Sequence, residues 1–479
     1  MAEGQIEAGN LEHRDPNEVD ATPAKRFFVE MLTRDIELPD AILDLLDNCV
    51  DGAMRSPRKA NATDEKPFLG YYADIYFSPD EFRIKDNCGG IPHDLAKKYA
   101  LRLGRPDPDR DAHLATVGVY GIGMKRAIFK LGTESTIYSN HSDGAFVIPI
   151  SSDWLDDDKN WKLQMQNAQS QEDFGTEITV KSLRESVKTF FDPDADDFQQ
   201  RFETTLVKHY SYIIEKGFKV RVNKIEIIPK IPKFLFDTSA LSDKNGILPY
   251  IYETSIDGVD IKLIMGMYAK LPTEQEVDEG VEGKRNKNEA GWTIICNDRI
   301  VLENDKTHLT GWGEARVPHY HSQFISIAGV VSFQSNDARK LPVKTTKRGI
   351  DLDSSIYAMV KEQMREALKI FTSFTNKWKS DTPERIAIQA NAEAIDIRNI
   401  AEIIPKDSWK TVLKGAKGVR FVPELPEGNT KKTSSRIVFI KPKTEIDEVR
   451  TYLGLDDDSD PSQVGSAAFE SILNITRKK

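Results

Sequence analysis

The sequence has few cysteines, no long apolar run and no apolar segment at its start. Its 479 residues include three widely spaced cysteines, Cys49, Cys88 and Cys296, and no CxxC pair. This pattern fits a reducing compartment better than a disulfide framework, and it argues against a cysteine zinc site. No run of about 18 apolar residues occurs, and residues 1–20 lack the apolar core of a signal peptide. These absences predict a cytoplasmic protein with no membrane partner.

The overall composition is that of a soluble globular protein, with 39% hydrophobic and 30% charged residues. A chain of 479 residues is too long for one hydrophobic core, so two or three domains are expected. The net charge of −10 argues against a protein that coats nucleic acid over its whole surface. A local basic patch remains compatible with this charge.

The stretch from Asp40 to Ala53 predicts an amphipathic helix. Pro39 suits the first position of a helix, and apolar residues recur at helical spacing behind it. Asp44 and Asn48 fall one turn apart on another stripe, where oxygen ligands could hold a hydrated Mg²⁺. Taken alone, the stretch fits an ordinary helix with a solvated acidic face better than a metal site.

A hairpin is predicted next, with strands at 71–77 and 81–85. Its second strand runs into Asp86-Asn87-Cys88-Gly89-Gly90-Ile91. A carboxylate at a strand end, followed by glycines, can lie at the floor of a pocket and accept from an exocyclic amine such as that of adenine. A plain Asx-turn explains the same residues equally well.

A glycine-rich segment, Gly118-Val119-Tyr120-Gly121-Ile122-Gly123-Met124-Lys125, precedes a predicted helix. Glycines before a helix N-terminus expose backbone N–H groups to an anion, and a lysine adds a point charge for phosphate. The spacing GxxGxG matches neither the dinucleotide fingerprint nor the P-loop. Such a loop is weak evidence by itself.

Four elements in this order resemble the GHKL ATPase superfamily, which includes the ATP-binding part of DNA gyrase, MutL, MORC proteins, heat-shock chaperones and histidine kinases. They are the Asp/Asn helix, the strand ending in DNCGGI, the VGVYGIGMKRA lid and the GTEITV strand at 175–180. The resemblance covers about residues 22–182. It implies a Bergerat-type α/β sandwich that binds ATP and Mg²⁺.

The resemblance also implies roles for individual residues. Asn48 would ligate Mg²⁺, Asp86 would accept from the adenine amine, and Thr176 would hydrogen-bond near Asp86. The remaining residues expected to contact ATP are Asp51, Gly90, Ile91, Gly118, Gly121, Ile122, Gly123, Met124 and Lys125.

Two residues depart from the family pattern. Asp44 stands where most hydrolytic members place a glutamate as general base, and it is one methylene, about 1.5 Å, shorter. A misplacement of this size can lower the rate about a hundredfold. Cys88 stands where the family usually has its first glycine. ATP binding is therefore a firmer expectation than fast turnover.

The stretch from Leu341 to Asp351 carries three cations on a predicted loop, which could be a solvated surface. In gyrase, MutL and MORC proteins a transducer domain follows the ATPase domain and sends a lysine to the γ-phosphate. Position and order match here, so Lys347 is the first candidate for this catalytic lysine and Lys344 the second. The absence of a helical segment with a phospho-accepting histidine separates the chain from histidine kinases.

The predicted fold is α+β, in four segments. Residues 1–21 are expected to be disordered, 22–223 to form the ATP-binding domain, and 224–380 to form an α/β transducer resembling a ribosomal protein. Residues 381–479 are expected to form a small α/β region of unknown role. Helices are predicted at 94–103, 354–378, 382–400 and 464–475. A basic segment surrounds a predicted strand at 437–440, as a solvated surface or a nucleic-acid contact.

The sequence therefore predicts an ATP hydrolase, with Asp44 and Lys347 as catalytic residues. Its nucleotide state would rearrange or dimerise the chain and act on a DNA or protein partner. The alternatives are a slow, nucleotide-gated binding module, which Asp44 favours, and a chaperone-like protein.

Overall fold

The computed structural model describes residues 24–102, 122–158, 160–243, 246–273, 276–277, 289–344, 347–378, 383–412, 417–427, 437 and 440–477. Residues 1–427 and 428–479 form two separate units. The predicted disordered segment, and Gly118 and Gly121 of the predicted lid, lie outside the described residues. So do residues 438 and 439 of the predicted strand at 437–440.

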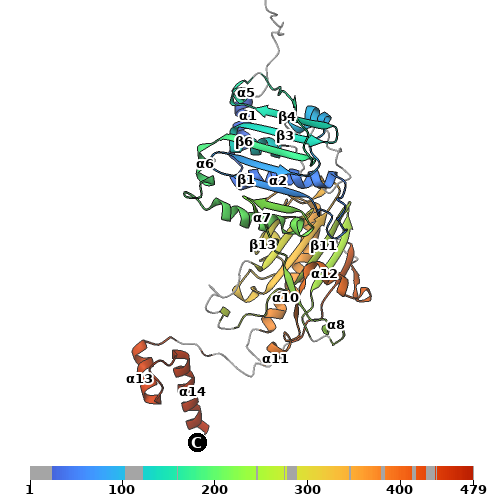
Figure 1. Cartoon of the computed structure of the whole chain (residues 1–479). Coiled ribbons are helices and arrows are strands. Elements are labelled where there is room, and N and C mark those ends of the chain that lie inside the picture. Colours follow the sequence, from blue (N-terminus) through green and yellow to red (C-terminus); the bar gives the residue numbers. More distant parts are fainter. Residues whose placement is uncertain are drawn as a thin grey trace, which may run out of the picture. The chain divides into compact units, whose positions relative to one another are not determined.

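The N-terminal domain is built on a mixed sheet with the strand order β5-β4-β3-β6-β2-β1-β7-β8 (Figure 1). Its strands are β1 (Tyr72–Phe77), β2 (Phe82–Asp86), β3 (Gly132–His141), β4 (Gly144–Ile150), β5 (Gln166–Asn167), β6 (Gly175–Leu183), β7 (Lys219–Val222) and β8 (Ile225–Glu226). The predicted hairpin of β1 and β2 is confirmed, in the register Phe77 to Phe82. Among the described strands of this sheet, β1 and β7 are the one parallel pair.

One face of this sheet is covered by helices, since buried and less buried residues alternate along β1. The helices of this domain are α1 (Lys25–Arg34), α2 (Leu38–Arg55), α3 (His93–Leu95), α4 (Gly123–Leu131), α5 (Ser152–Asp156), α6 (Glu185–Phe191) and α7 (Phe198–Glu215). The predicted helix at 94–103 is wrong in extent. The α-helix ends at Leu95, and a π-helical turn, Ala96–Ala100, follows.

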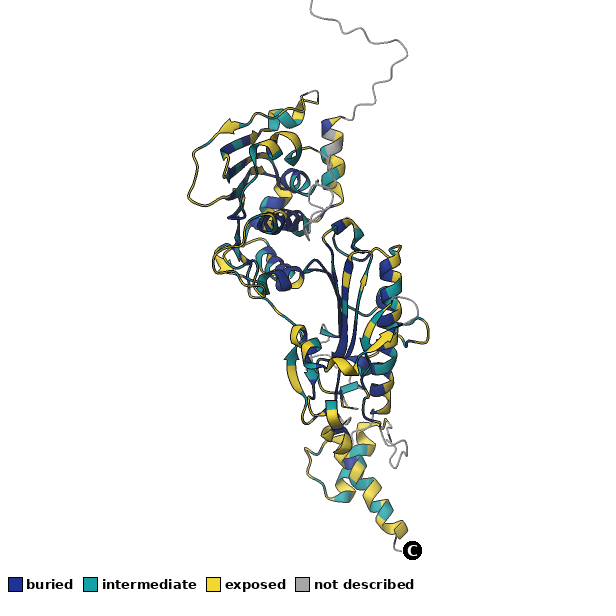
Figure 2. Ribbon diagram, turned by 90° about the vertical axis from the view of Figure 1, so that its right-hand side faces the viewer, coloured by how far each residue is buried: buried dark blue, intermediate teal, exposed yellow. Residues whose placement is uncertain are grey.

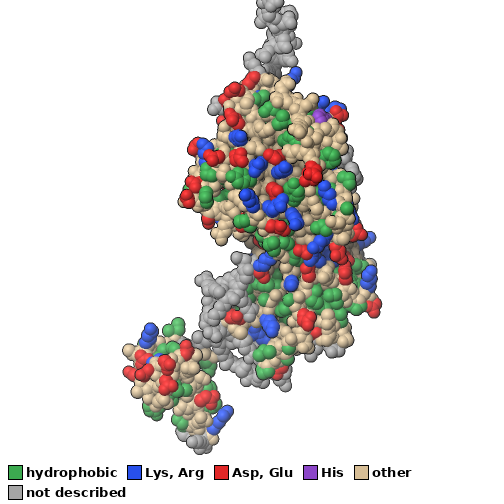
Figure 3. Space-filling model, in the orientation of Figure 1, with side chains coloured by type: hydrophobic (Ala, Val, Ile, Leu, Met, Phe, Trp, Pro, Cys, Tyr) green, Lys and Arg blue, Asp and Glu red, His purple; other side chains and the backbone are tan. Residues whose placement is uncertain are grey.

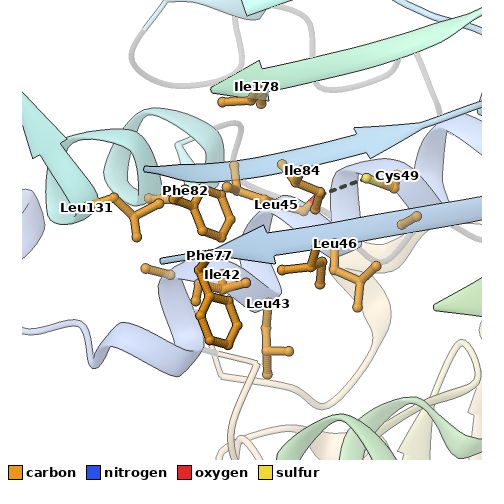
Figure 4. Close-up of a cluster of buried hydrophobic side chains, with 14 of the residues drawn as sticks. Ile42, Leu43, Leu45, Leu46, Cys49, Phe77, Phe82, Ile84, Leu131 and Ile178 are labelled. Atoms are coloured by element: carbon orange, nitrogen blue, oxygen red, sulfur yellow. Dashed lines mark hydrogen bonds between the residues drawn. The ribbon is translucent and has the colours of Figure 1, made fainter. Parts of the chain in front are cut away.

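The core of the domain lies between α2 and the sheet. Apolar side chains of α2, among them Ile42, Leu45 and Leu46, point toward Phe82 and Ile84 of the hairpin (Figure 4). Each of these five side chains is almost wholly buried. Burying a side chain of this size contributes roughly 1.5–3 kcal/mol. This packing fixes the rotation of α2 about its axis, and with it the direction of its polar residues.

The other face of the sheet is polar. Figure 3 shows Lys and Arg side chains over β1, β2 and β6, with Asp and Glu between them. Lys85 lies 3.8 Å from Glu177, and Arg221 pairs with Asp74. This face therefore carries alternating charge rather than a uniformly basic surface.

The second sheet of residues 1–427 follows the order β13-β12-β14-β11-β10-β17-β16, and β9 joins it through β11 and β15. The strands are β9 (Lys233–Phe236), β10 (Tyr250–Ile256), β11 (Val259–Met267), β12 (Gly291–Cys296), β13 (Arg299–Asp305), β14 (Ile327–Gln334), β15 (Glu393–Asp396), β16 (Lys410–Val412) and β17 (Gly418–Phe421). All six residues of β12 are buried. Both faces of this sheet are therefore covered, as Figure 2 shows in the dark colour of its central strands.

The long predicted helix at 354–378 is confirmed as α10 (Ser355–Lys377), which packs on β10 and β11. The predicted helix at 382–400 is wrong. This stretch forms α11 (Pro383–Ala387), β15 and α12 (Ile397–Ile403). Glu393–Asp396 pairs antiparallel with β9, and this tertiary pairing overrides the local helical pattern. A short helix, α8 (Ala240–Asp243), follows β9.

Strands β15, β16 and β17 extend the second sheet past residue 380, where the sequence-based division placed a separate C-terminal region. β17 pairs with β10, in the register Ile251 to Phe421. The C-terminal unit itself contains α13 (Lys443–Leu453) and α14 (Pro461–Arg477) in its described part. The mixed α and β architecture predicted for the chain is confirmed. Within the described residues, no helix combines the length and apolar character that crossing a membrane requires.

Candidate functional site

Helix α2 presents one exposed residue in an otherwise buried stretch. From Ala41 to Asp51, Asn48 is the one exposed residue, and Asp44, Asp47 and Asp51 are buried. The side chain of Asn48 is thus free to meet a ligand, while the carboxylate of Asp44 lies one turn before it. Asp51 lies 3.9 Å from Arg55 one turn later and so has a local cation.

Asp86 ends β2 with its carboxylate buried, at 8% exposure. The backbone N–H groups of Cys88 and Thr176 donate to its Oδ1 at 2.8 and 3.2 Å. Burial raises the pKa of Asp86 to about 6, against the lowering effect of these hydrogen bonds. Thr176 contributes its backbone rather than its side chain to this contact. The thiols of Cys49 and Cys88 also hydrogen-bond to the side chain of Asp86. A carboxylate has about four acceptor positions, so a ligand could still donate to Asp86.

The glycines after Asp86 are required by close backbone contacts. Gly90 has a φ of +73°, and a Cβ there would lie 2.2 Å from the carbonyl oxygen of Asn140. At Gly89, with a φ of +93°, a Cβ would overlap Ser56. The N–H of Ile91 donates to Ser139 on β3 at 2.6 Å. The flexibility needed beside Cys88 is therefore supplied by Gly89, and the turn is fastened to β3.

The predicted lid is described from Ile122 onward. Gly123 begins α4, Ile122 caps it, and Met124 packs against the core. A Cβ on Gly123 would lie 3.1 Å from the carboxyl carbon of Asp44, so the helix start directly faces Asp44. Burial lowers the pKa of Lys125 to about 8, and its Nζ donates to the carbonyl of Ala100 at 3.0 Å. Lys125 therefore fastens the segment before the lid and is not displayed on the surface.

The structure brings the three predicted motifs together along α2. Gly123 lies against Asp44 near one end of the polar stripe. Near the other end, a Cβ on Gly52 would lie 2.9 Å from the carbonyl oxygen of Cys88. The strand end with Asp86 and the start of α4 therefore flank the stretch that carries Asn48. Helix N-termini favour anions, so a bound phosphate would be favoured at the α4 end.

Lys347 reaches α2 from the loop between β14 and α10. Its Nζ lies 2.5 Å from Oδ2 of Asp47 and 3.5 Å from Oδ1 of Asp44. The competing candidate, Lys344, is exposed. Residue 347 has a φ of +56°, a conformation that is uncommon for a residue with a side chain. Hydrogen bonds support it, because its N–H donates to the carbonyl of Lys344 at 2.8 Å.

Two arginines complete the charge cluster around these carboxylates. Arg299, at the start of β13, lies 3.0 Å from Oδ1 of Asp47 and donates to the carbonyl of Lys347 at 3.3 Å. Arg126 of α4 pairs with Oδ2 of Asp44, its Nε at 3.2 Å. The hydroxyl of Tyr210 donates to Asp47 from α7. Arg348, which directly follows Lys347, also contacts α2, through an ion pair with Asp40.

The cluster shifts the pKa values of its members in a consistent direction. Burial alone would raise the pKa of Asp47, but Arg299 and Lys347 outweigh it and hold that pKa below its ordinary value. Burial alone would lower the pKa of Lys347, but Asp47 and Asp44 hold it above its ordinary value. Carboxylate and ammonium are thus both charged near neutral pH, and the pair joins α2 to the second sheet as an ion pair.

Sequence reasoning missed Asp47, Arg126, Arg299 and Tyr210. Asp47 is one residue from Asn48, and Arg126 directly follows Lys125, so proximity to the motifs was an available signal for both. Arg299 and Tyr210 carry no local signal, because only the folded chain brings β13 and α7 to α2. We call the contact between the ATP-binding domain and the second sheet the junction. Two further ion pairs contribute to it, Lys216 to Asp298 at 2.6 Å and Lys208 to Glu303 at 3.4 Å.

The residues present fit Mg²⁺ that is held mainly by a ligand's own oxygens. Among the described residues, no three His, Cys, Asp or Glu side chains gather into a metal-binding group. Asn48 supplies one accessible oxygen of the type that Mg²⁺ accepts, and this ion commonly keeps several waters and substrate phosphates. Bound there, Mg²⁺ would neutralise phosphate charge.

Comparison with known proteins supports the same assignment. No curated protein matches the chain significantly. Residues 36–187 match the family described as "Histidine kinase-, DNA gyrase B-, and HSP90-like ATPase". The matched segment begins just before α2 and ends within α6, so it contains α2, the Asp86 turn, the start of α4 and β6. The chain therefore carries an ATP-binding domain of the GHKL ATPase superfamily at residues 36–187.

Proposed function

We propose that this protein is a Mg·ATP-dependent ATPase whose second α/β domain reads the nucleotide through Lys347. The contact of Lys347 with Asp47 and Asp44 carries this proposal. Asp44 faces the start of α4, where phosphate is favoured, so a γ-phosphate bound there would compete with two carboxylates for one ammonium. Lys347 therefore has a different partner in each nucleotide state, which is what a switch requires.

Asp44 is the proposed general base, and in this structure its carboxylate already forms ion pairs. Arg126 and Lys347 both pair with its carboxylate. With Arg126 on one oxygen and Lys347 near the other, the carboxylate has fewer positions left to hold an attacking water. Movement of Lys347 to phosphate would remove one of these cations. Hydrolysis would then be coupled to the same change that the nucleotide produces, and Lys347 would stabilise the developing phosphate charge.

A second candidate function is a slow, nucleotide-gated binding module, in which ATP acts mainly as a ligand. The retained Arg126 pair and the short Asp44 side chain favour it. In either case we propose a MORC-like or standalone bacterial type of member of the superfamily, because an α/β domain with a lysine that contacts α2 follows the ATP-binding domain. Nucleotide-dependent dimerisation, with DNA or a protein as partner, is part of the proposal.

Phosphate release from ATP by the purified chain tests the proposal, with and without duplex DNA. We expect Mg²⁺-dependent release that is abolished by Asn48→Ala, because Asn48 is the accessible ligand on α2. Asp44→Asn should stop release while ATP still binds. A matched control is Asp64→Asn, an exposed carboxylate paired with Arg58, which should leave the rate unchanged.

The outcomes separate the two candidates. Release that Asp44→Asn leaves intact would reject Asp44 as the base. Bound ATP without measurable release in the wild type would reject the ATPase and retain the binding module. Stimulation by duplex DNA would identify the partner class, whereas an unchanged rate would favour a protein partner.

A further inference from the structure

Arg126 is the cation of the charge cluster that belongs to the ATP-binding domain itself. It lies near the start of α4, and its backbone N–H donates to the carbonyl of Ile122 at 3.0 Å. Its side chain is 16% exposed and pairs with Asp44, whose side chain is 6% exposed. Among the described residues, Asp44 is the one carboxylate with which Arg126 forms an ion pair. Lys347, by contrast, reaches two carboxylates from the loop before α10.

The two carboxylate oxygens of Asp44 have separate partners. Nε of Arg126 lies 3.2 Å from Oδ2, and Nη2 of Arg126 donates to the same atom. Nζ of Lys347 lies 3.5 Å from Oδ1 of Asp44, and it lies closer to Asp47. If Lys347 moves to a γ-phosphate, Oδ1 loses its cation while Oδ2 stays held by two donors. A carboxylate that is fixed through one oxygen has a defined direction for the other, which is how a base is oriented by a further group.

The space around Asp44 fits an aspartate closely. A Cβ on Gly123 would lie 3.1 Å from the carboxyl carbon of Asp44 and 3.3 Å from Oδ2, so the start of α4 packs directly on the carboxylate. The extra methylene of a glutamate would have to displace α4 or Arg126, because overpacked sites shift their neighbours. The short side chain at position 44 is therefore matched to the arginine of α4.

We propose that Arg126 is the positioning residue for Asp44 in the hydrolysis of ATP. It holds Oδ2, so that Oδ1 faces the attacking water once Lys347 has moved to the phosphate. The water attacks the γ-phosphorus, its proton passes to Oδ1, and the bond from phosphorus to the bridging oxygen breaks as ADP leaves with the electron pair. The inference rests on the proposed function, and it adds that the base acts as a pair, Asp44 with Arg126.

Steady-state ATP turnover by Arg126→Gln tests the inference, measured as kcat and KM separately. We expect kcat to fall about 10- to 100-fold, because misplacing a reacting group by about 1 Å has an effect of this order. KM for ATP should change less than about threefold, since Arg126 acts through Asp44 and not on the nucleotide. Arg126→Lys keeps the charge without the planar fork and should recover part of the loss. The matched control is Arg201→Gln, an exposed arginine of α7 paired with Asp196, which should leave both constants unchanged.

Asp44→Glu separates a matched pair from a base that is merely too short. We expect kcat of Asp44→Glu to be no higher than that of the wild type, because the added methylene displaces Arg126. An increase of about tenfold or more would show that the length of side chain 44 limits the reaction, and would overturn the pairing.

The other outcomes separate this inference from the proposed function. Release of phosphate by the wild type with an unchanged kcat in Arg126→Gln would overturn the inference and leave the ATPase in place. A faster Arg126→Gln would make the arginine a restraint on Asp44, which also overturns the positioning role. A rise in KM of about tenfold or more would make Arg126 a ligand of the nucleotide instead. Binding of ATP without release in the wild type would overturn both the ATPase and this role.

Discussion

Asp86 and Asp47 are both buried carboxylates of the ATP-binding domain, and their surroundings move their pKa values in opposite directions. Asp86 accepts from backbone N–H groups, and its pKa rises to about 6 because burial dominates. Asp47 meets Arg299, Lys347 and Tyr210, and its pKa stays below its ordinary value. The hydrogen bonds that hold Asp86 all come from its own domain. Asp47 is held by cations from the second α/β domain, so it reports on contact between the two domains.

This difference fits the different tasks that we propose for the two carboxylates. A site built on backbone donors keeps its shape whatever the second domain does, which suits recognition of a base. A site whose partners come from another sheet can be taken apart when one cation finds a better anion, which suits switching. Substituting each carboxylate in turn should therefore have different effects. Loss of ATP binding is expected for Asp86, and weaker contact between the two domains is expected for Asp47.

The largest expected effect follows from Asp47→Asn. It would leave Arg299 and Lys347 buried with less compensating charge, and breaking one side of such a group costs about 3–5 kcal/mol. We expect the melting temperature to fall by roughly 10 °C, measured by calorimetry. Adding Arg299→Met to Asp47→Asn should recover part of the loss, because an apolar side chain replaces the uncompensated charge. Equal melting temperatures for Asp47→Asn and wild type would show that the pair does not hold the junction.

Lys347→Met should affect turnover of ATP much more than binding of ATP. Loss of a charged donor to a developing phosphate typically lowers turnover about 10² to 10³-fold. We expect phosphate release to fall by about a hundredfold while ATP affinity changes much less, since Asp86 and Asn48 are intact. Lys344→Met is the matched control, because Lys344 is an exposed lysine of the same loop. If Lys344→Met lost activity and Lys347→Met kept it, the assignment of the sensing lysine would be reversed.

The parts of the site that the sequence predicts are those with a local pattern. Helical spacing places Asp44 and Asn48 one turn apart, and a strand followed by glycines marks Asp86. Arg299 has no such pattern, because it acts on α2 only through the pairing of β12 with β13 and the packing of α7 on β13. The helix predicted at 382–400 fails for the same reason. Residues 393–396 form β15 instead, which pairs with β9, a strand far away in the sequence.

Asp86→Asn should give the next largest effect, now on binding alone. A hydrogen bond to a charged acceptor is worth about 1.5–3 kcal/mol, so ATP affinity should fall roughly 10- to 100-fold by calorimetric titration. The melting temperature should not fall, because the substitution removes a buried charge. The control is Asp74→Asn, a carboxylate on the polar face of β1, which should leave affinity unchanged. A large drop in stability with unchanged affinity would reverse the roles assigned to Asp86 and Asp47.

The last prediction concerns pH dependence, which distinguishes the two carboxylates by the sign of their contributions to stability. The folded pKa of Asp86 is about 6, above its ordinary value of 3.8, so the folded chain binds more protons than the unfolded chain between these values. Stability without nucleotide should therefore rise as pH falls from 6 toward 4, by up to about 3 kcal/mol from this residue.

ATP affinity should move the other way over the same range, about tenfold per pH unit below 6, because a protonated carboxylate accepts poorly from an amine. The contribution of Asp47 has the opposite sign and a different window. Its folded pKa is lowered, so its stabilising effect is present above the unfolded value and is lost as pH falls through the folded value, below 3.8. Urea unfolding and ATP titration of wild type and Asp86→Asn across pH 4–7 measure both effects. In Asp86→Asn the difference in affinity between pH 4 and pH 6 should shrink, and a profile identical to the wild type would assign that titration to another group.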